Sequence, residues 1–177
     1  HKTIISSDKD FFQLCREDVS IYRPIQKKTM TKDSIINEFK IHPKNFALAR
    51  AMAGDASDNL PGIRGAGLKT IAKRFPYLVR EDEYEVSDII RDCAMQAKKL
   101  KIHENIQTGE TLIKENYKIM QLYYPNIRPL NRQLITKAVS DFDPYFDKIK
   151  FTQMLFDDDA GHLNFDALQY ILRSIKR

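Results

Sequence analysis

A glycine-rich loop between two helical patterns sets the strongest limit on the fold of this chain. Residues 54–70 carry four of the six glycines among 177 residues. Before this loop, the residues from Pro43 onward carry apolar side chains at helical spacing, and a proline fits the first turn of a helix. Residues 68–75 form a second, short helical pattern that stops at Pro76. The sequence therefore predicts two helices joined by a loop over residues 55–67.

Short strands precede this region, and helices follow it. Predicted strands cover residues 3–7 (buried, ending in an acidic turn), 19–24 and 28–31 (at a sheet edge), with a helical turn over 11–14. Thr31 is the predicted N-cap of a helix that begins at residue 32. Amphipathic runs then occupy residues 88–101, 111–123, 129–139, 145–156 and 165–175. The sequence thus predicts a mainly α chain with a few N-terminal strands.

Composition excludes several classes of protein. No apolar run reaches the roughly 18 residues that a membrane span needs, and no basic segment followed by an apolar one marks a signal peptide at the N-terminus. Cys15 and Cys93 are too few for a disulfide framework, so a cytoplasmic location is expected. The 29 Lys and Arg exceed the 24 Asp and Glu, and this net charge of +5 permits nucleic-acid binding without requiring it.

Two pairs of aspartates are candidate metal ligands. Asp8 and Asp10 lie one residue apart after the first predicted strand, so they can point at neighbouring metal ions. Asp55 and Asp58 are three residues apart, so one helical turn would place both carboxylates on the same side. Mg²⁺ binds carboxylates, water and phosphate oxygens, and two ions roughly 4 Å apart promote phosphodiester hydrolysis. The alternatives are an acidic turn for the first pair, and helix capping before a Pro-Gly turn for the second.

Residues 62–70 form a candidate phosphate-binding hairpin. Glycines spaced three and then two apart let the backbone approach a phosphate, and the following helix offers amides and the positive end of its dipole. Three basic side chains can add contacts: Lys69, Lys73 and Arg74. A Walker A loop is excluded, because Leu68 separates Gly67 from Lys69 and no buried strand precedes the loop. A hairpin that holds a nucleic-acid backbone without reading its sequence fits better; a plain connection between helices is the alternative.

Together and in this order, these segments resemble the 5′ nuclease superfamily, which includes flap endonucleases, the 5′-nuclease domain of bacterial DNA polymerase I and phage 5′→3′ exonucleases with ribonuclease H activity. The motifs that carry the resemblance are Ile-Ser-Ser-Asp-Lys-Asp-Phe-Phe-Gln-Leu at residues 5–14 and Gly-Asp-Ala-Ser-Asp-Asn-Leu-Pro-Gly-Ile-Arg-Gly-Ala-Gly-Leu-Lys-Thr at residues 54–70. The resemblance covers about residues 3–75 and is highly specific, because two long motifs recur with the right separation. It implies an α/β parent fold with a helix–hairpin–helix DNA-binding subdomain.

The resemblance also implies a nuclease of DNA replication or repair that uses two or more Mg²⁺ or Mn²⁺ ions. The implied catalytic and metal-binding residues are Asp8, Asp10, Asp55 and Asp58. The implied DNA-binding residues are Gly62, Ile63, Arg64, Gly65, Ala66, Gly67, Lys69, Thr70 and Lys73. Related enzymes carry a monovalent cation, often K⁺, on carbonyls of this hairpin, which points here to Ile63. The implied partners are DNA with a 5′ flap, nick or primer–template junction, RNA·DNA hybrids, and a single-strand-binding protein or sliding clamp.

Several of the family's parts lie upstream of these motifs and are missing from this sequence: an early metal-binding Asp, an acid-rich segment and a basic helical arch. We therefore expect the chain to be the C-terminal half of a 5′ nuclease, most similar to a stand-alone phage enzyme, and inactive or nearly so by itself. The expected divisions are core strands over residues 1–31, the hairpin subdomain over 32–80 and a helical region over 81–177. The alternative function is a non-catalytic DNA-binding module, which would not need four aspartates.

Overall fold

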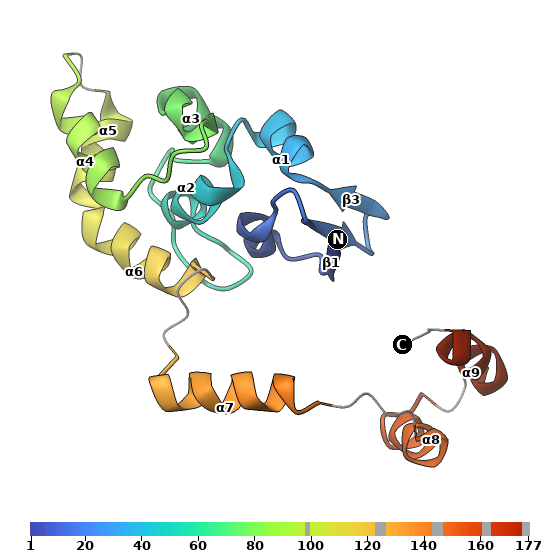
Figure 1. Cartoon of the computed structure of the whole chain (residues 1–177). Helices are drawn as coiled ribbons and strands as arrows, with labels where there is room; N and C mark the ends of the chain where they lie inside the picture. Colours follow the sequence, from blue (N-terminus) through green and yellow to red (C-terminus); the bar gives the residue numbers. More distant parts are fainter. Residues whose placement is uncertain (98–99, 123–126, 143–146, 161–163, 175–177) are drawn as a thin grey trace. The chain divides into compact units, whose positions relative to one another are not determined.

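The computed structural model describes residues 1–97, 100–122, 127–142, 147–160 and 164–174 (Figure 1). The chain divides into two compact units, His1–Asn126 and Ile127–Arg177, which are described separately. A small N-terminal sheet followed by helices confirms the predicted mainly α chain. The divisions expected at residues 31 and 80 remain predictions, and both positions lie inside the first unit.

Three short strands form a sheet in the order β1-β2-β3. β1 (Lys2–Ile5) runs parallel to β2 (Val19–Arg23), and β2 is antiparallel to β3 (Lys28–Met30). The 3-10 helix η1 (Lys9–Leu14) lies between β1 and β2 in the chain and buries Phe12. The expectation that the first strand is buried is wrong: β1 is one of the two edge strands of this sheet, with β3 at the other edge as predicted, and Ile5 is 72% exposed. β2 is the strand that enters the core instead.

The helices around the glycine-rich loop follow their local signals. α1 (Lys32–Phe39) begins after Thr31, whose side chain accepts a hydrogen bond from the Ser34 N–H, as the N-cap prediction requires. The 3-10 turn η2 (Pro43–Asn45) leads directly into α2 (Phe46–Ala53), and α3 (Leu68–Arg74) is followed by η3 (Pro76–Val79). The predicted pair of helices on either side of a loop is therefore confirmed.

The end of the first unit differs from the prediction. It contains α4 (Val86–Met95), α5 (Lys101–Thr108) and α6 (Glu110–Met120). The helix predicted over residues 88–101 is wrong in its second half, because α4 ends at Met95 and a separate helix begins at Lys101. The sequence pattern did not predict α5, which buries only His103 and Ile106. α6 was predicted, although it ends three residues earlier than expected.

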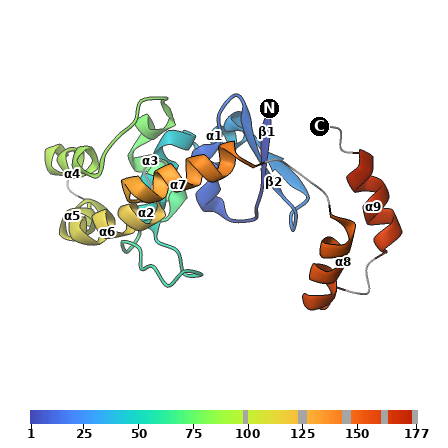
Figure 2. The same ribbon diagram turned by 60° about the horizontal axis from the view of Figure 1, so that its bottom comes forward.

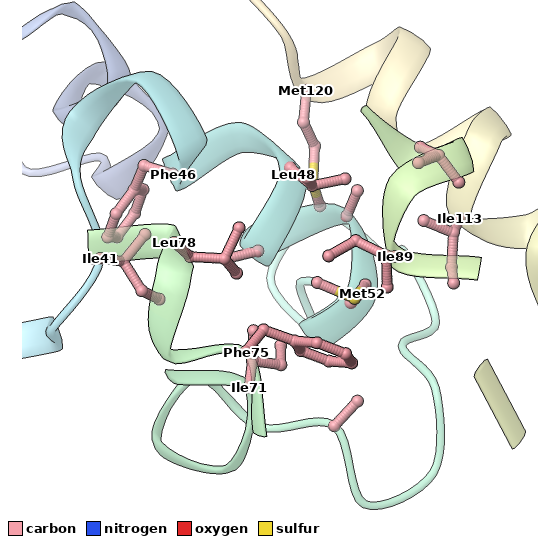
Figure 3. Close-up of a cluster of buried hydrophobic side chains, with 14 of the residues drawn as sticks. Ile41, Phe46, Leu48, Met52, Ile71, Phe75, Leu78, Ile89, Ile113 and Met120 are labelled. Carbon is pink, nitrogen blue, oxygen red and sulfur yellow. The ribbon is translucent and has the colours of Figure 1, made fainter. Parts of the chain in front are cut away.

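α2 is the centre of the hydrophobic core. Every residue from Phe46 to Met52 is buried, because η1, α3 and α6 all pack against this helix (Figure 3). The side chains labelled in Figure 3 show this convergence: Ile41, Phe46, Leu48, Met52, Ile71, Phe75, Leu78, Ile89, Ile113 and Met120. A helix enclosed in this way has a fixed position, so groups attached to its end are held firmly in place.

The second unit contains α7 (Pro129–Ser140), α8 (Lys148–Asp157) and α9 (Phe165–Ser174). α8 and α9 lie side by side (Figure 2), with the rings of Phe156 and Phe165 5.5 Å apart. These helices confirm the three amphipathic runs predicted here; the predicted residues 145, 146 and 175 lie outside the described residues. None of the described helices in either unit has the length and apolar character to cross a bilayer.

Candidate functional site

A polar cavity of about 390 Å³ lies between the start of η1 and the turn that follows α2. Its lining residues are Ser7, Asp8, Lys9, Arg50, Asp55, Ser57 and Asp58. The structure therefore brings three of the four predicted aspartates to one cavity. The fourth, Asp10, does not line the cavity but pairs with Arg50, which does.

Asp8 and Asp10 have different surroundings, although only one residue separates them. Asp8 is exposed and caps η1, because its carboxylate accepts a hydrogen bond of 2.8 Å from the Asp10 N–H. The Asp10 side chain is only 15% exposed. Burial raises the pKa of Asp10, and this effect outweighs the opposing pull of the Arg50 guanidinium. The acidic-turn interpretation of Asp8 is thus compatible with its position in the cavity.

Asp55 and Asp58 belong to a tight turn. The expectation that one helical turn aligns them is wrong: Asp55 and Leu60 exchange two backbone hydrogen bonds of 2.8 Å, and Asn59 adopts a left-handed φ of 60°. Oδ1 of Asp55 accepts hydrogen bonds from Ser57 N (2.9 Å) and Ser57 Oγ (2.6 Å). These bonds, aided by Arg50, lower the pKa of Asp55 to about 2. Asp58 is exposed and still faces the same cavity.

Arg50 is a site residue that the sequence analysis missed. Its side chain is 9% exposed, its Nε donates to Oδ1 of Asp10 at 3.0 Å, and its Nη2 donates to Oδ2 of Asp55. One signal in the sequence could have found it, because Arg50 is the single charged residue in the apolar stretch Phe-Ala-Leu-Ala-Arg-Ala-Met-Ala of α2. A lone arginine on a buried helix needs a buried carboxylate partner.

The donor set suits a hard divalent cation in type but does not complete a site. Carboxylate oxygens are the ligands that Mg²⁺ prefers in proteins. Within the described ranges, however, no three Asp, Glu, His or Cys side chains converge closely enough to hold one ion. The residues seen here can therefore supply part of a metal-binding site, with further ligands needed to close it.

The glycine-rich hairpin, residues 61–67, is anchored by two inward side chains. Ile63 and Ala66 are buried, the Ile63 N–H donates to the Met52 carbonyl at 2.8 Å, and the Ile63 carbonyl accepts from Ala66 N–H at 2.9 Å. Gly65 forms the tip with a φ of 85°, which disfavours other residues. The remaining predicted DNA-binding residues are exposed or half-buried: Gly62, Arg64, Gly67, Lys69, Thr70 and Lys73. The hairpin and the helix α3 that follows it thus present backbone groups and basic side chains on the surface.

Two asparagines, one on α5 and one on α6, donate hydrogen bonds to backbone carbonyls in and next to the hairpin. Neither was predicted from the sequence. The buried amide of Asn116 donates to the carbonyls of Ala51 (3.0 Å) and Pro61 (2.8 Å). The Asn105 amide donates to the Arg64 carbonyl at 3.0 Å. Because these contacts join residues 41 to 65 positions apart, no local sequence pattern marks them. They make α5 and α6 the support of the hairpin.

The chain is similar in sequence to known nucleases and to DNA polymerase I. The chain is 35% identical to DNA polymerase I of Rhizobium leguminosarum over 59% of its own length, and 40% identical to a 5'-3' exonuclease of Aquifex aeolicus over 38%. It is 30% identical to flap endonuclease Xni of Pseudoalteromonas translucida over 58% of its length. The chain covers 10%, 23% and 38% of those three proteins, respectively. No protein-family model matches the chain.

Solved structures show the same fold. A T5 5'-exonuclease with bound zinc superposes on 68% of this chain and 42% of its own, with a TM-score of 0.55 and 24% identity. A T5 D15 flap endonuclease in a complex with DNA and metal ions matches with the same TM-score, identity and coverage. About two thirds of this chain therefore share a fold with metal-bound and DNA-bound nucleases.

Proposed function

Because this chain belongs to the 5′ nuclease superfamily, we propose that it is part of a divalent-metal-dependent 5′→3′ exonuclease or flap endonuclease acting in DNA replication or repair. One observation carries the proposal: a single cavity gathers Asp8, Asp55 and Asp58, and the exposed hairpin follows directly in the chain. The exonuclease and flap endonuclease relatives support it. The chain would be the C-terminal portion of that enzyme, consistent with its partial coverage of those relatives.

In this proposal two or more Mg²⁺ or Mn²⁺ ions are bound by Asp8, Asp10, Asp55 and Asp58. Further ligands, which the described residues do not supply, complete the coordination. The bound ions supply Lewis-acid activation of water and neutralise charge at the scissile phosphate. The exposed carboxylates of Asp8 and Asp58 are accessible to an ion in the cavity. The turn over residues 55–60 fixes the Asp55 carboxylate through its Ser57 hydrogen bonds, so this ligand is held in place before an ion binds.

The hairpin would hold the duplex beside the cut site through its backbone amides and Arg64, together with Lys69 and Lys73 of α3. Contacts of this kind position a nucleic acid without reading its sequence. The substrates in this proposal are duplexes with a 5′ flap, a nick or a primer–template junction, and RNA·DNA hybrids. A monovalent cation such as K⁺ would bind the carbonyl of Ile63, which still has one lone pair beyond the Ala66 hydrogen bond.

A non-catalytic DNA-binding module is the second candidate function. It is favoured by the incomplete metal site, because no three potential ligands converge within the part of the chain that the structure describes. Cleavage of a 5′-flap duplex by the full-length protein separates the two functions. We expect cleavage with Mg²⁺ and none with a chelator. Binding of the duplex without cleavage under either condition would establish the non-catalytic function instead.

The proposed DNA grip predicts the behaviour of a charge-removing variant. Arg64→Gln with Lys69→Gln in the full-length protein should weaken duplex binding by about tenfold or more, because two phosphate contacts are lost. The plot of log K against log salt concentration should become shallower, with the magnitude of its negative slope reduced by about two. Binding is measured by fluorescence anisotropy over a series of salt concentrations.

The matched control is Lys28→Gln with Lys114→Gln, which removes the same charge from β3 and α6, where both lysines form exposed ion pairs. We expect this control to bind duplex with nearly the affinity of the unmodified protein. Equal losses in the two double variants would mean that net charge, and not the hairpin, determines binding.

A further inference from the structure

Arg50 forms ion pairs with two of the four candidate metal ligands, Asp10 and Asp55. Its guanidinium binds Oδ1 of Asp10 through Nε at 3.0 Å and Oδ2 of Asp55 through Nη2. All three side chains are largely buried, with 9%, 15% and 16% exposure for Arg50, Asp10 and Asp55. A buried ion pair of this kind is strongly coupled, because solvent screens it poorly.

Three hydrogen bonds occupy most of the acceptor capacity of the Asp55 carboxylate in this arrangement. Oδ2 binds Arg50, while Oδ1 accepts both the N–H and the hydroxyl of Ser57. One lone pair remains on Oδ2, beside the guanidinium, so an ion that coordinates this oxygen competes with Arg50. The Ser57 bonds are short-range contacts within the tight turn, whereas the Arg50 contact crosses from α2, so the guanidinium is the donor that can be exchanged without unfolding the turn.

Charge leads to the same conclusion. A divalent ion bound to Asp10 and Asp55 would lie next to the Arg50 guanidinium. Two neighbouring cations repel each other strongly in a buried site. The carboxylates therefore cannot serve Arg50 and an ion equally well. In the absence of an ion, Arg50 provides the countercharge that lets two carboxylates remain ionised close together away from water.

We propose that Arg50 is the resident cation of this site: it holds Asp10 and Asp55 in place while no metal is bound, and a divalent ion binds by displacing its guanidinium from them. This inference rests on the proposed metal-binding role of the aspartates. Arg50 is thus a positioning residue that sets the affinity of the site for metal. Its replacement should tighten metal binding and should lower the stability of the metal-free protein.

The test compares Arg50→Gln and Arg50→Lys with Arg91→Gln in the full-length protein without DNA. Arg91 forms an exposed pair with Asp88 on α4, so its replacement removes the same charge outside the candidate site. Mn²⁺ affinity is measured by calorimetry, and thermal unfolding is followed with and without Mn²⁺. We expect Arg50→Gln to bind Mn²⁺ about tenfold more tightly, Arg50→Lys to lie nearer the unmodified protein, and Arg91→Gln to match it.

Thermal unfolding provides a second measurement that does not depend on activity. Without metal, Arg50→Gln should unfold at a lower temperature than the unmodified protein, and saturating Mn²⁺ should raise its unfolding temperature by more. A ¹⁵N NMR titration of the unmodified protein should show the Arg50 Nε–H resonance shifting as Mg²⁺ binds. This resonance reports on the displacement directly, even where a variant perturbs the fold.

The outcomes separate this inference from the proposed function. Equal or weaker Mn²⁺ binding by Arg50→Gln, or an Arg50 resonance that Mg²⁺ leaves unchanged, would overturn the role of Arg50 alone. A lack of Mn²⁺ binding by every variant and by the unmodified protein would overturn the metal role of the aspartates, and the role of Arg50 with it.

Discussion

Replacing Asp55 and Asp58 together by asparagine in the full-length protein is expected to reduce cleavage of a 5′-flap duplex by about three orders of magnitude or more. Both carboxylates face the same cavity, and asparagine keeps the shape of the side chain while it removes the charge that binds a divalent ion. DNA binding should be retained, because the hairpin begins beyond this turn. Single-turnover cleavage and fluorescence anisotropy measure the two properties separately.

The control for this variant is Asp33→Asn with Glu104→Gln, which removes two exposed carboxylates from α1 and α5. Cleavage by this control should remain close to that of the unmodified protein. If the Asp55 and Asp58 variant loses DNA binding in proportion to cleavage, the aspartates support the hairpin and do not hold metal.

Gly62→Ala is expected to destabilise the first unit by at least about 3 kcal/mol. An added Cβ at residue 62 would lie 1.9 Å from the Ala53 carbonyl oxygen and 2.8 Å from Gly54 N. Both are backbone atoms at the end of α2, which the core holds in place, so the clash cannot be relieved by a side-chain rotation. Urea unfolding followed by circular dichroism measures the loss.

Two neighbouring glycines supply graded controls for this clash. Nothing lies within 4 Å of a Cβ at Gly65 or Gly67, but Gly65 has a φ of 85°. Gly65→Ala should therefore cost about 1–2 kcal/mol through backbone strain, and Gly67→Ala less than about 1 kcal/mol. A Gly62→Ala protein as stable as Gly67→Ala would show that the contact between residues 53 and 62 is not rigid.

Local signals predicted most of the first half of the chain. Thr31 marks the start of α1 because its side chain satisfies the helix's free amide, and Pro76 ends α3 because proline cannot continue a helix. The division between α4 and α5 escaped prediction, because an uninterrupted amphipathic pattern runs across residues 88–101 without a proline or glycine. Periodicity alone could not show that the chain turns there.

The candidate site was predictable only in part. The aspartates stand in recognisable motifs, whereas their surroundings depend on contacts between distant segments. Arg50 meets Asp10 across 40 residues, and Asn116 meets Pro61 across 55. The tight turn at Asp55 was also missed. It depends on the left-handed backbone conformation of Asn59, which the spacing of two aspartates does not reveal.

α2 fixes the positions of both parts of the proposed site, the aspartates and the hairpin. Arg50 extends from this helix to the aspartates, while the carbonyls of Ala51 and Met52 receive the bonds that seat the hairpin. Inserting or deleting one residue within α2 would rotate the following positions by about 100° and shift them by about 1.5 Å. Both connections would then fail together. Changes of length in homologous proteins should consequently fall in the segments on either side of α2 and spare its eight residues.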